Sequence, residues 1–297
     1  MIGYAVTVYD ANEAAGGMLR YGIPEYRLPY DQVDKDIEYI RSLGVTIHQN
    51  VRIGVDVPFS EIYGDNDAVF FFTGLSDPYA LEIPGEHLNG VIPGLTVLDE
   101  VTNGKTPDIG SSVVVVGGGN VAMDAARTSR RYGAEVTILY RRREEDMPAD
   151  SEEIEESKGE NIQIITQAIP LRIEKGQERR LRLVWGRAEM VPDERGDRPR
   201  PKLIEGREET IECDTVIPAI GQQADYQFLP PKIAERLEFE RGMVTVNEFR
   251  QTGDTKIFAG GDITNRTRDA ISAIANGHSA AKGIDIYLTN FSAGETT

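Results

Sequence analysis

Cysteine and histidine are scarce in this sequence, and their scarcity removes several kinds of chemistry. Cys213 is the one cysteine among 297 residues, so the chain has neither a disulfide framework nor a redox dithiol of its own. An iron–sulfur cluster ligated within the chain is also excluded, because such clusters take about four thiolates. Cys213 comes just before an apolar strand, and we expect it to be a packing residue. The three histidines, His48, His87 and His278, are far apart and lack neighbouring ligands, so no metal site is predicted.

Basic residues are also in deficit. The sequence has 32 Lys and Arg against 49 Asp and Glu, a formal net charge of -17. Nucleic acids need a positive protein surface, so we exclude them as partners. Many of the carboxylates lie in residues 144–160, and we expect them to form a solvated helix face; they include Asp150, Glu152, Glu153, Glu155 and Glu156. A docking patch for a basic partner is the alternative.

Long hydrophobic runs are absent as well. No stretch approaches the roughly 18 consecutive apolar residues of a membrane span, and the N-terminus does not show a cationic segment followed by a long apolar run. We therefore expect a soluble, cytoplasmic protein without membrane partners. The remaining composition is that of a globular protein, with 40% hydrophobic residues, 27% charged residues and 30 glycines. The length suffices for two domains.

Strand-length apolar runs alternate with helical segments, which predicts an α/β fold with parallel sheets. The expected strands are residues 5–9, 45–49, 68–73, 113–116, 135–140, 161–168, 181–184, 215–220 and 257–259. The expected helices are residues 30–43, closed by Gly44, and 269–288. Residues 78–106, with several prolines and glycines, are expected to be a connector, and residues 192–201 a hairpin tip.

Residues 113–122 have the pattern of a nucleotide-phosphate cradle. An apolar strand is followed by glycines and by a helix that begins with Asn120 and Val121. Gly117 allows the tight turn, Gly119 lets backbone amides approach a pyrophosphate, and Ala122 lets the helix pack closely on the sheet. The helix N-terminus then faces an anion. The alternative is a purely structural turn, but a second strand follows at the distance that a dinucleotide motif requires.

Three arginines, Arg141, Arg142 and Arg143, follow that second strand. In an NAD site this position carries an acidic residue for the ribose, whereas a guanidinium suits a 2′-phosphate. The sequence therefore predicts NADP(H) as a ligand. The alternative is a solvated cluster of surface charges.

A second candidate site lies at residues 257–262, where a predicted strand ends in Gly260, Gly261 and Asp262 before a helix rich in small residues. Asp262 can accept hydrogen bonds from the ribityl hydroxyls of a flavin, and the helix N-terminus can donate to its phosphates. It can equally be a capping aspartate. The residues alone leave both interpretations open.

Five segments together resemble the small subunit of glutamate synthase and its relatives. Residues 8–29 contain Gly-Ile-Pro-Glu-Tyr-Arg-Leu-Pro, and residues 141–149 read Arg-Arg-Arg-Glu-Glu-Asp-Met-Pro-Ala. Residues 113–124, 214–221 and 257–281 match other signatures of these NADPH-dependent FAD oxidoreductases, in the same order. The family is part of the pyridine nucleotide-disulfide oxidoreductase superfamily, and the resemblance covers nearly the whole chain.

The resemblance implies two Rossmann-like dinucleotide-binding domains. An NADP(H)-binding domain, residues 106–220, would be inserted in a FAD-binding-like domain, residues 1–105 and 221–297. Asp10 would stand where an acidic residue accepts hydrogen bonds from the FAD ribose, and Gly16 and Gly17 would line the approach to the flavin. Gly74 would end the crossover strand. Gly261 and Asp262 would contact the ribityl and pyrophosphate region.

The chain departs from this family at its N-terminus. Family members have a strand with its own Gly-x-Gly-x-x-Gly turn upstream of the ribose acid, and many have a cysteine-rich iron–sulfur module before it. Here Met1 stands a few residues ahead of Asp10, so the FAD pyrophosphate cradle is missing. We expect the incomplete sheet to expose unpaired backbone and apolar side chains. The chain is a fragment of a longer gene, or it pairs with a polypeptide that supplies the strand, or it has given up FAD; we favour the fragment.

The resemblance also implies an activity. Hydride would pass from NADPH to FAD and electrons would pass on to an iron–sulfur partner, and no side chain would act as catalytic acid, base or nucleophile because the chemistry belongs to the cofactors. Glu25 and Arg27 either shape the flavin environment or form a surface ion pair. The alternative function is a non-catalytic NADP(H)-binding subunit. Thioredoxin reductase-like chemistry is disfavoured because its thiol pair is missing.

Overall fold

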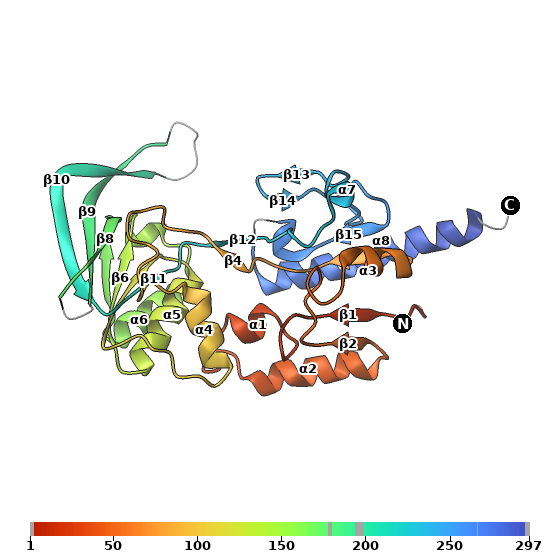
Figure 1. Ribbon diagram of the computed structural model, residues 1–297, viewed down its shortest axis with the longest axis horizontal. Helices are drawn as coiled ribbons and strands as arrows, with labels where there is room; N and C mark the ends of the chain where they lie inside the picture. Colours follow the sequence, from red (N-terminus) through yellow and green to blue (C-terminus); the bar gives the residue numbers. More distant parts are fainter. Residues whose placement is uncertain (1–2, 178–179, 194–198, 266, 295–297) are drawn as a thin grey trace. The chain divides into compact units, whose positions relative to one another are not determined.

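The computed structural model describes residues 3–177, 180–193, 199–265 and 267–294. The chain divides into two compact units (Figure 1). Unit 1 contains Met1–Leu19, Tyr30–Asp77 and Gln222–Thr297, and unit 2 contains Arg20–Pro29 and Pro78–Gly221. The predicted α/β class is confirmed, because both units contain parallel strands connected through helices. Within the described residues, no helix combines the length and apolar character that crossing a bilayer requires.

Unit 2 is built on a four-stranded parallel sheet with the strand order β11, β5, β6, β7. These strands are Thr215–Pro218, Ser112–Val116, Glu135–Tyr140 and Gln163–Thr166. Successive side chains of a strand point to opposite faces, and β5 shows this with four valines. Val113 and Val115 belong to a core shared with helices, whereas Val114 and Val116 belong to a core shared with a second sheet. Both faces of the sheet are therefore buried, which is the usual condition of parallel strands.

Helices cover one face of this sheet. They are α4 (Gly94–Thr102), α5 (Asn120–Arg131) and α6 (Ser151–Gly159), and the short helix η1 (Glu144–Asp146) lies before α6. The side of α5 that faces the sheet carries small side chains, including Ala122, Ala125 and Ala126, which are fully buried. Small residues let the helix lie close to the strands, and this closeness places the start of α5 directly beyond the end of β5.

An antiparallel sheet of β8 (Ala168–Lys175), β9 (Leu181–Val191) and β10 (Arg200–Cys213) covers the other face (Figure 1). The sequence predicted four residues of β9 and did not predict β10. The exposed edge strand β10 is mostly charged and polar, and its glutamates pair with arginines of β8 and β9 rather than alternating with apolar residues. The expected hairpin tip falls between β9 and β10, and its residues 194–198 lie outside the described part of the chain. Cys213 is buried at the end of β10, as expected of a packing residue.

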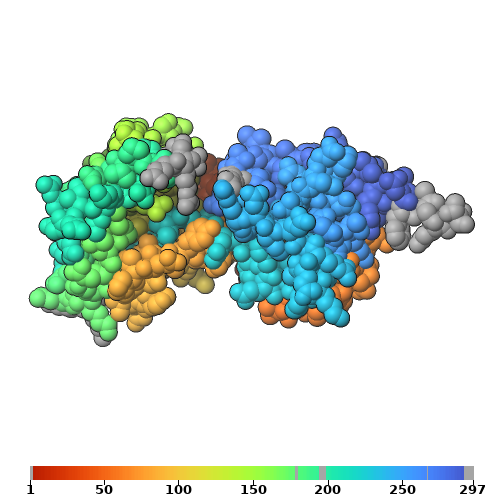
Figure 2. Space-filling view, turned by 90° about the horizontal axis from the view of Figure 1, so that it is seen from above, coloured from red at the N-terminus to blue at the C-terminus, as the bar shows by residue number. Residues whose placement is uncertain are grey.

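Residues 78–105, which we expected to connect the domains within the FAD-binding-like part, belong to unit 2. In Figure 2 these residues, orange to gold, lie against green residues of that unit. The physical reason is burial, since Val97 of α4 lies in the core between the helices and the sheet. Ile92 also donates its backbone N–H to Val216 of β11. Pro93 and Gly94, two of the residues that suggested a connector, mark the start of a short helix, α4.

Unit 1 contains two separate two-stranded parallel sheets. In one, β1 (Thr7–Tyr9) pairs with β2 (Thr46–His48), and in the other β3 (Val69–Phe71) pairs with β15 (Ile257–Ala259). The helices are α2 (Tyr30–Ser42), α3 (Phe59–Asp65), α7 (Pro231–Ala234), η2 (Gly261–Ile263) and α8 (Ala270–Gly294), and the strands β13 (Phe239–Glu240) and β14 (Met243–Val244) form a small hairpin. The core is mostly aliphatic and contains a small aromatic cluster, in which Phe59 meets Phe71 and Phe228 edge to face.

The expected exposure of this incomplete sheet is confirmed. Within the described residues, β1 pairs with β2 alone, and β3 pairs with β15, whose other edge is bridged by Gln251. Open edges therefore remain on the β1–β2 pair and on β3. Val8 in β1 and Val6 just before it are exposed, and so is Phe72, directly after β3. Open edges with apolar side chains are ready to pair with a further strand.

Three elements lie where the chain passes between the units. Helix α1 (Met18–Tyr21) leads from unit 1 into the Arg20–Pro29 segment of unit 2. The short strands β4 (Asp77–Pro78) and β12 (Gln222–Gln223) pair at two of the other three passages. Unit 2 thus consists of one long insertion and one short segment that comes from the N-terminal part of the chain.

Candidate nucleotide-binding site

The glycine turn of unit 2 lies where β5 ends and α5 begins. β5 has β11 on one side and β6 on the other, so the strand order reverses at this point, and ligands of open α/β sheets bind at such a crevice. A Cβ atom at Gly117 would lie 2.2 Å from the carbonyl oxygen of Ala219 and 3.1 Å from Cβ of Ala122. Gly117 and Ala122 therefore allow the close approach of strand and helix that the sequence predicted.

Gly119 has a different environment. The nearest atom to a Cβ at this position would be Cγ of Pro148, at 3.8 Å, so the space in front of the residue is open. Gly119 is the N-cap residue of α5 and no side chain caps the helix. The first amide groups of Asn120 and Val121 thus belong to an uncapped helix N-terminus, which is a site that favours an anion.

Of the three predicted arginines, two carry no acidic partner. Arg141 is exposed and Arg142 is half-buried, and no carboxylate in the described part of the chain forms an ion pair with either. Nε of Arg142 is buried without a hydrogen-bond partner, which is costly for a charged group and marks a position that a ligand can satisfy. Arg143 differs, because it binds the carboxylates of Glu145 and Asp146.

Residues 146–150 fold back over the glycine turn, which the sequence did not reveal. The hydroxyl of Tyr140 donates to the carbonyl oxygen of Asp146 at 2.7 Å, and the N–H of Ala149 donates to the carbonyl oxygen of Gly118 at 3.1 Å. The Asn120 amide donates to the Asp150 carboxylate at 3.1 Å and accepts from the Asp150 N–H at 2.9 Å. The Met-Pro-Ala part of the motif at residues 141–149 thus forms one wall of the site.

A cluster of buried charges lies one turn further along α5. Arg27 donates to both oxygens of Asp124 at 2.8 Å, and its Nε lies 2.7 Å from Glu153 of α6. Arg127 contacts Glu153 and Glu156, and its Nε donates to Glu160 at 3.0 Å. The side chains of Arg27, Asp124 and Glu153 are 21%, 3% and 9% exposed.

This cluster corrects two expectations. Glu153 does not belong to a solvated helix face, because it is buried between Arg27 and Arg127. The Arg27 ion pair is not a surface pair, because its carboxylate partners are buried. Burial raises the pKa of Asp124 to about 6, although Arg27 opposes this shift. Tyr26 belongs to the same segment and stacks under Arg131, whose guanidinium carbon lies 3.7 Å from the ring centre.

The predicted FAD contacts of unit 1 lie at the ends of its strands. Asp10 follows β1, and its carboxylate accepts from the N–H of Asn12 at 2.9 Å. Gly16 and Gly17 have positive φ before α1. Gly74 comes after β3, and Gly261 comes after β15, the partner of β3; both have positive φ. These two glycines therefore share one end of a parallel strand pair.

Asp262 follows Gly261 in η2, and burial raises its pKa. Asn276 of α8 organises this turn and was not predicted. Its buried carbonyl oxygen accepts from the N–H of Gly261 at 3.2 Å, from the hydroxyl of Thr264 at 3.3 Å and from the amide of Asn265 at 3.2 Å. The signal for Asn276 was weak, because a single polar residue in a helix of small residues does not show which turn it faces.

The described residues fit NADP(H) and fit FAD in part. For NADP(H), an open glycine turn, an uncapped helix and two unpaired arginines are present in unit 2. For FAD, the turns at Gly74 and Gly261 are present, but within the described part of unit 1 no strand leads through a Gly-x-Gly-x-x-Gly turn into a helix. Within the described residues, a flavin diphosphate would have no such cradle.

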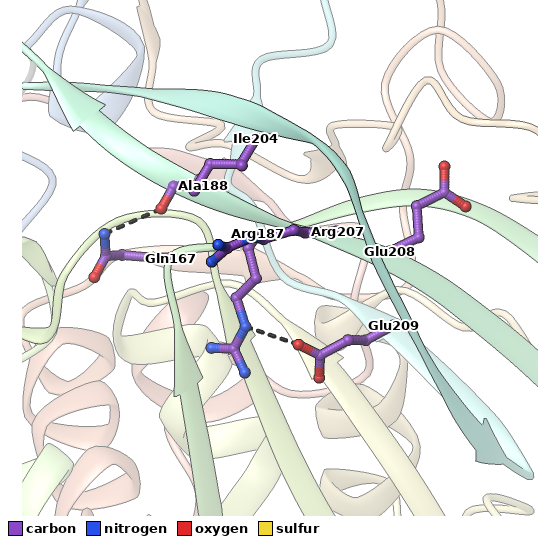
Figure 3. Close-up of a pocket in the computed structure, with 7 residues that line it drawn as sticks. All are labelled: Gln167, Arg187, Ala188, Ile204, Arg207, Glu208 and Glu209. Atoms are coloured by element: carbon purple, nitrogen blue, oxygen red, sulfur yellow. Dashed lines mark hydrogen bonds and ion pairs between the residues drawn. The ribbon is translucent and has the colours of Figure 1, made fainter.

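A pocket elsewhere in unit 2 takes no part in this site. It measures about 360 Å³ and lies on the antiparallel sheet, lined by Gln167, Arg187, Ala188, Ile204, Arg207, Glu208 and Glu209 (Figure 3). Nε of Arg187 donates to Glu209 at 2.8 Å, and the Gln167 amide donates to the carbonyl oxygen of Ala188 at 3.1 Å. Its charges are of both signs and largely satisfy each other, and none of the predicted binding residues lines it.

Comparisons with known proteins agree with this geometry. The family model described as pyridine nucleotide-disulphide oxidoreductase matches residues 32–277. The beta subunit of NADP(+)-dependent formate dehydrogenase from Moorella thermoacetica is 41% identical over 293 residues, which cover 96% of this chain and 41% of that protein. The small chain of NADPH glutamate synthase from Escherichia coli is 33% identical over 306 residues, which cover 96% of this chain and 64% of that protein.

Solved structures show the same fold. FprA from Mycobacterium tuberculosis in complex with NADPH superimposes with a TM-score of 0.77 at 20% identity, covering 98% of this chain and 79% of FprA. The thioredoxin reductase of T. acidophilum has a TM-score of 0.71 at 19% identity, covering 98% of this chain and 92% of that one. The Rossmann-like fold that the sequence predicted is thus confirmed, whereas the chain spans between 41% and 64% of the length of these curated relatives.

Proposed function

Because the chain belongs to the pyridine nucleotide-disulphide oxidoreductase family, we propose that it binds NADPH at the glycine turn of unit 2 as part of an NADPH-dependent flavin oxidoreductase of the glutamate synthase small-subunit type. The observation that carries the proposal is the combination of open space at Gly119 with the buried, unpartnered Nε of Arg142. Both would be filled by the two phosphate-bearing parts of one ligand, its diphosphate and its 2′-phosphate.

The residues of unit 2 have separate roles in this proposal. The uncapped start of α5, at Asn120 and Val121, would donate backbone hydrogen bonds to the diphosphate. Arg141 and Arg142 would bind the 2′-phosphate with charge-assisted hydrogen bonds. The wall formed by residues 146–150 would limit the space beside Gly119. Bound NADPH supplies the hydride, and orientation and electrostatics are the contribution of the chain.

The acceptor and the partner are further parts of the proposal. Hydride would pass to FAD and electrons would pass to an iron–sulfur subunit or domain, as the family resemblance implies. The names of two relatives, a beta subunit and a small chain, describe members of larger assemblies, which supports a partner subunit here. Asp10, Gly16, Gly17, Gly74, Gly261 and Asp262 would contact the FAD, and we assign no step to a flavin within this chain because its diphosphate has no cradle here.

A second candidate is a non-catalytic NADP(H)-binding subunit that does not retain FAD by itself. The observation that favours it is the division of unit 1 into two separate strand pairs. Equilibrium titration of the purified chain with NADPH and with FAD distinguishes the two. Uptake of both ligands supports the oxidoreductase, and uptake of NADPH alone supports the binding subunit.

Both candidate functions include NADPH binding in unit 2, and substitution of Arg141 and Arg142 tests it. We expect the double substitution Arg141→Ala and Arg142→Ala to weaken NADPH binding by about tenfold or more, the effect of losing charge-assisted hydrogen bonds. NADH binding should change little, since NADH has no 2′-phosphate. Dissociation constants for both nucleotides, measured by isothermal titration calorimetry, check this.

A matched control removes two arginines far from the turn. Arg172 and Arg182 lie on the antiparallel sheet and pair with exposed glutamates, so their replacement by alanine should leave both dissociation constants unchanged. Equal losses of NADPH and NADH affinity in the Arg141/Arg142 variant would contradict the proposed site.

A further inference from the structure

The three consecutive arginines are not equivalent in their contacts. Nε and one Nη of Arg143 contact the two oxygens of Asp146 at 2.9 and 3.3 Å, and the other Nη lies 2.7 Å from a carboxylate oxygen of Glu145. All three nitrogens of this guanidinium therefore face carboxylates. Three of the five N–H donors of Arg143 are thus directed at carboxylates, and both edges of its fork already face an acidic group that would repel a phosphate.

The Asp146 side of this pair is well held. The Asp146 side chain is 10% exposed, against 41% for Arg143 and 69% for Glu145. Hydrogen bonding to Arg143 lowers the pKa of Asp146, and Arg142 lowers it further, so Asp146 is ionised at neutral pH. The backbone N–H of Asp146 also donates to the carbonyl oxygen of Arg143 at 3.0 Å. Side chain and backbone together close one tight turn over residues 143–146.

This turn is connected to the glycine turn by a short chain of contacts. Asp146 accepts the hydroxyl of Tyr140 through its carbonyl oxygen. The ring of Tyr140 lies under Gly118, where a Cβ atom would come within 2.4 Å of it. On the other side, the carbonyl oxygen of Arg142 accepts from the N–H of Gln167 at 2.9 Å. The backbone that carries Arg141 and Arg142 is thus held at two points. One is the hydrogen bond between Arg142 and Gln167, and the other is the turn that Arg143 and Asp146 close.

We propose that Arg143 is a positioning residue, which with Asp146 closes the turn that presents Arg141 and Arg142 to the 2′-phosphate, and that it is not itself a phosphate ligand. The inference rests on the proposed NADPH site and deepens it. The two roles make opposite predictions for Asp146. If Arg143 is a positioning residue, removing Asp146 loosens the turn and weakens NADPH binding. If Arg143 is a phosphate ligand, removing Asp146 frees its guanidinium and strengthens NADPH binding.

The test measures dissociation constants for NADPH and NADH with the full chain and its variants Arg143→Ala, Asp146→Ala, the double variant and Arg142→Ala. We expect Arg143→Ala and Asp146→Ala each to weaken NADPH binding by about two- to fivefold, the size of a surface ion-pair effect. The double variant should be no weaker than either single variant, because both remove the same contact. Arg142→Ala should lose about tenfold or more. The ratio of NADPH to NADH affinity should fall in all four, which a general loss of folding would not produce.

Asp146→Asn guards against loss of fold, because it keeps the size of the side chain while removing its charge; it should weaken NADPH binding as Asp146→Ala does. Tighter NADPH binding in either Asp146 variant would overturn the positioning role. So would losses that add up in the double variant. A wild-type chain that does not prefer NADPH over NADH would instead refute the proposed function, so the two failures are distinguishable.

Discussion

Gly117 and Gly119 belong to one turn, yet the structure gives them different constraints. A Cβ atom at Gly117 would collide with the backbone of Ala219, at 2.2 Å, whereas a Cβ atom at Gly119 would meet nothing closer than 3.8 Å. The φ of Gly119 is -96°, which alanine also adopts. Gly117 is thus required by the fold, whereas the fold leaves room for a methyl group at Gly119, the position that the proposed diphosphate would approach.

Alanine substitutions should separate the two requirements. We expect Gly117→Ala to destabilise the chain by about 1–3 kcal/mol, the usual cost of overpacking. Gly119→Ala should leave thermal unfolding nearly unchanged but weaken NADPH binding by about tenfold, because its methyl group occupies the space of the diphosphate. Differential scanning calorimetry and nucleotide titration of both variants check this. Full NADPH affinity in Gly119→Ala would mean that the diphosphate does not lie at this turn.

Asp124 should give the stability of the chain a measurable dependence on pH. Burial raises its pKa from 3.8 to about 6 in the folded protein, against the opposing effect of Arg27, while Glu153 adds to the increase. Between these two values the folded state binds the proton more tightly than the unfolded state does, so the free energy of unfolding falls as pH rises through this window. The contribution of Asp124 is at most about 3 kcal/mol, at about 1.4 kcal/mol per pKa unit.

Asp124→Asn removes this titration and keeps the shape of the side chain. Urea unfolding of both proteins at pH 4 to 7 should therefore show a shallower loss of stability with rising pH in the variant. The difference between the two curves isolates Asp124 from the other acidic groups. Parallel curves would show that Asp124 titrates at its ordinary pKa.

Sequence patterns predicted the residues whose roles depend on local backbone geometry. Gly117, Gly119 and Ala122 lie where their spacing placed them, because a strand, a turn and a helix that follow each other directly leave little freedom. The partners of Arg27 could not be predicted, since Asp124 and Glu153 are distant in the sequence and no local pattern links them. Glu153 shows the same limit, because a glutamate in an acidic stretch resembles its exposed neighbours.

At the scale of elements, the segment Arg20–Pro29 is held on helices α5 and α6 by charge. Arg27 supplies a guanidinium to two buried carboxylates, Asp124 and Glu153, and Tyr26 packs under Arg131. Removing one partner of a buried ion pair leaves an uncompensated charge. The Gly-Ile-Pro-Glu-Tyr-Arg-Leu-Pro stretch therefore has a structural role, attachment to α5 and α6, that does not require contact with a flavin.

We expect Arg27→Ala to destabilise unit 2 by about 3–5 kcal/mol, the cost of breaking a buried ion pair. Arg27→Lys should recover only part of this loss, because an ammonium keeps the charge but lacks the two-pronged geometry. Urea unfolding and hydrogen exchange of residues 20–29 measure both effects. Arg187→Ala is the matched control, since Arg187 and Glu209 are 44% and 47% exposed and such pairs contribute about 0–1 kcal/mol. Equal losses in Arg27→Ala and Arg187→Ala would show that the buried cluster adds nothing beyond a surface pair.

The elements that sequence patterns missed are those without hydrophobic periodicity of their own. Edge strand β10 is held by its pairing with β9 and by cross-strand ion pairs, and neither leaves a local signature. Helix α4 is nine residues long and begins after Pro93, so proline and glycine marked its boundary and concealed its interior. The long apolar runs at β5 and β6, in contrast, were predicted almost to the residue because burial on both faces demands them.

At the scale of the whole molecule, the family resemblance implied one domain inserted in another, and the compact units of the structure divide the chain at different residues from those domains. Contacts made by buried side chains of residues 78–105 and 20–29 assign both stretches to unit 2. A change of composition marks where a linker is exposed, whereas membership of a unit depends on what a segment packs against. The open edges of β1 and β3 were predicted correctly, because the number of strands a parallel sheet needs follows from its topology.

The Arg20–Pro29 segment has a consequence for the modularity of this architecture. Residues 78–221, excised as an independent module or grafted onto another scaffold, would carry Asp124 without the Arg27 guanidinium that binds it and would leave Glu153 with Arg127 as its buried partner. A transferable nucleotide-binding module therefore comprises two discontinuous segments. Exchange of this module between homologues has to transfer the ten residues Arg20–Pro29 together with residues 78–221.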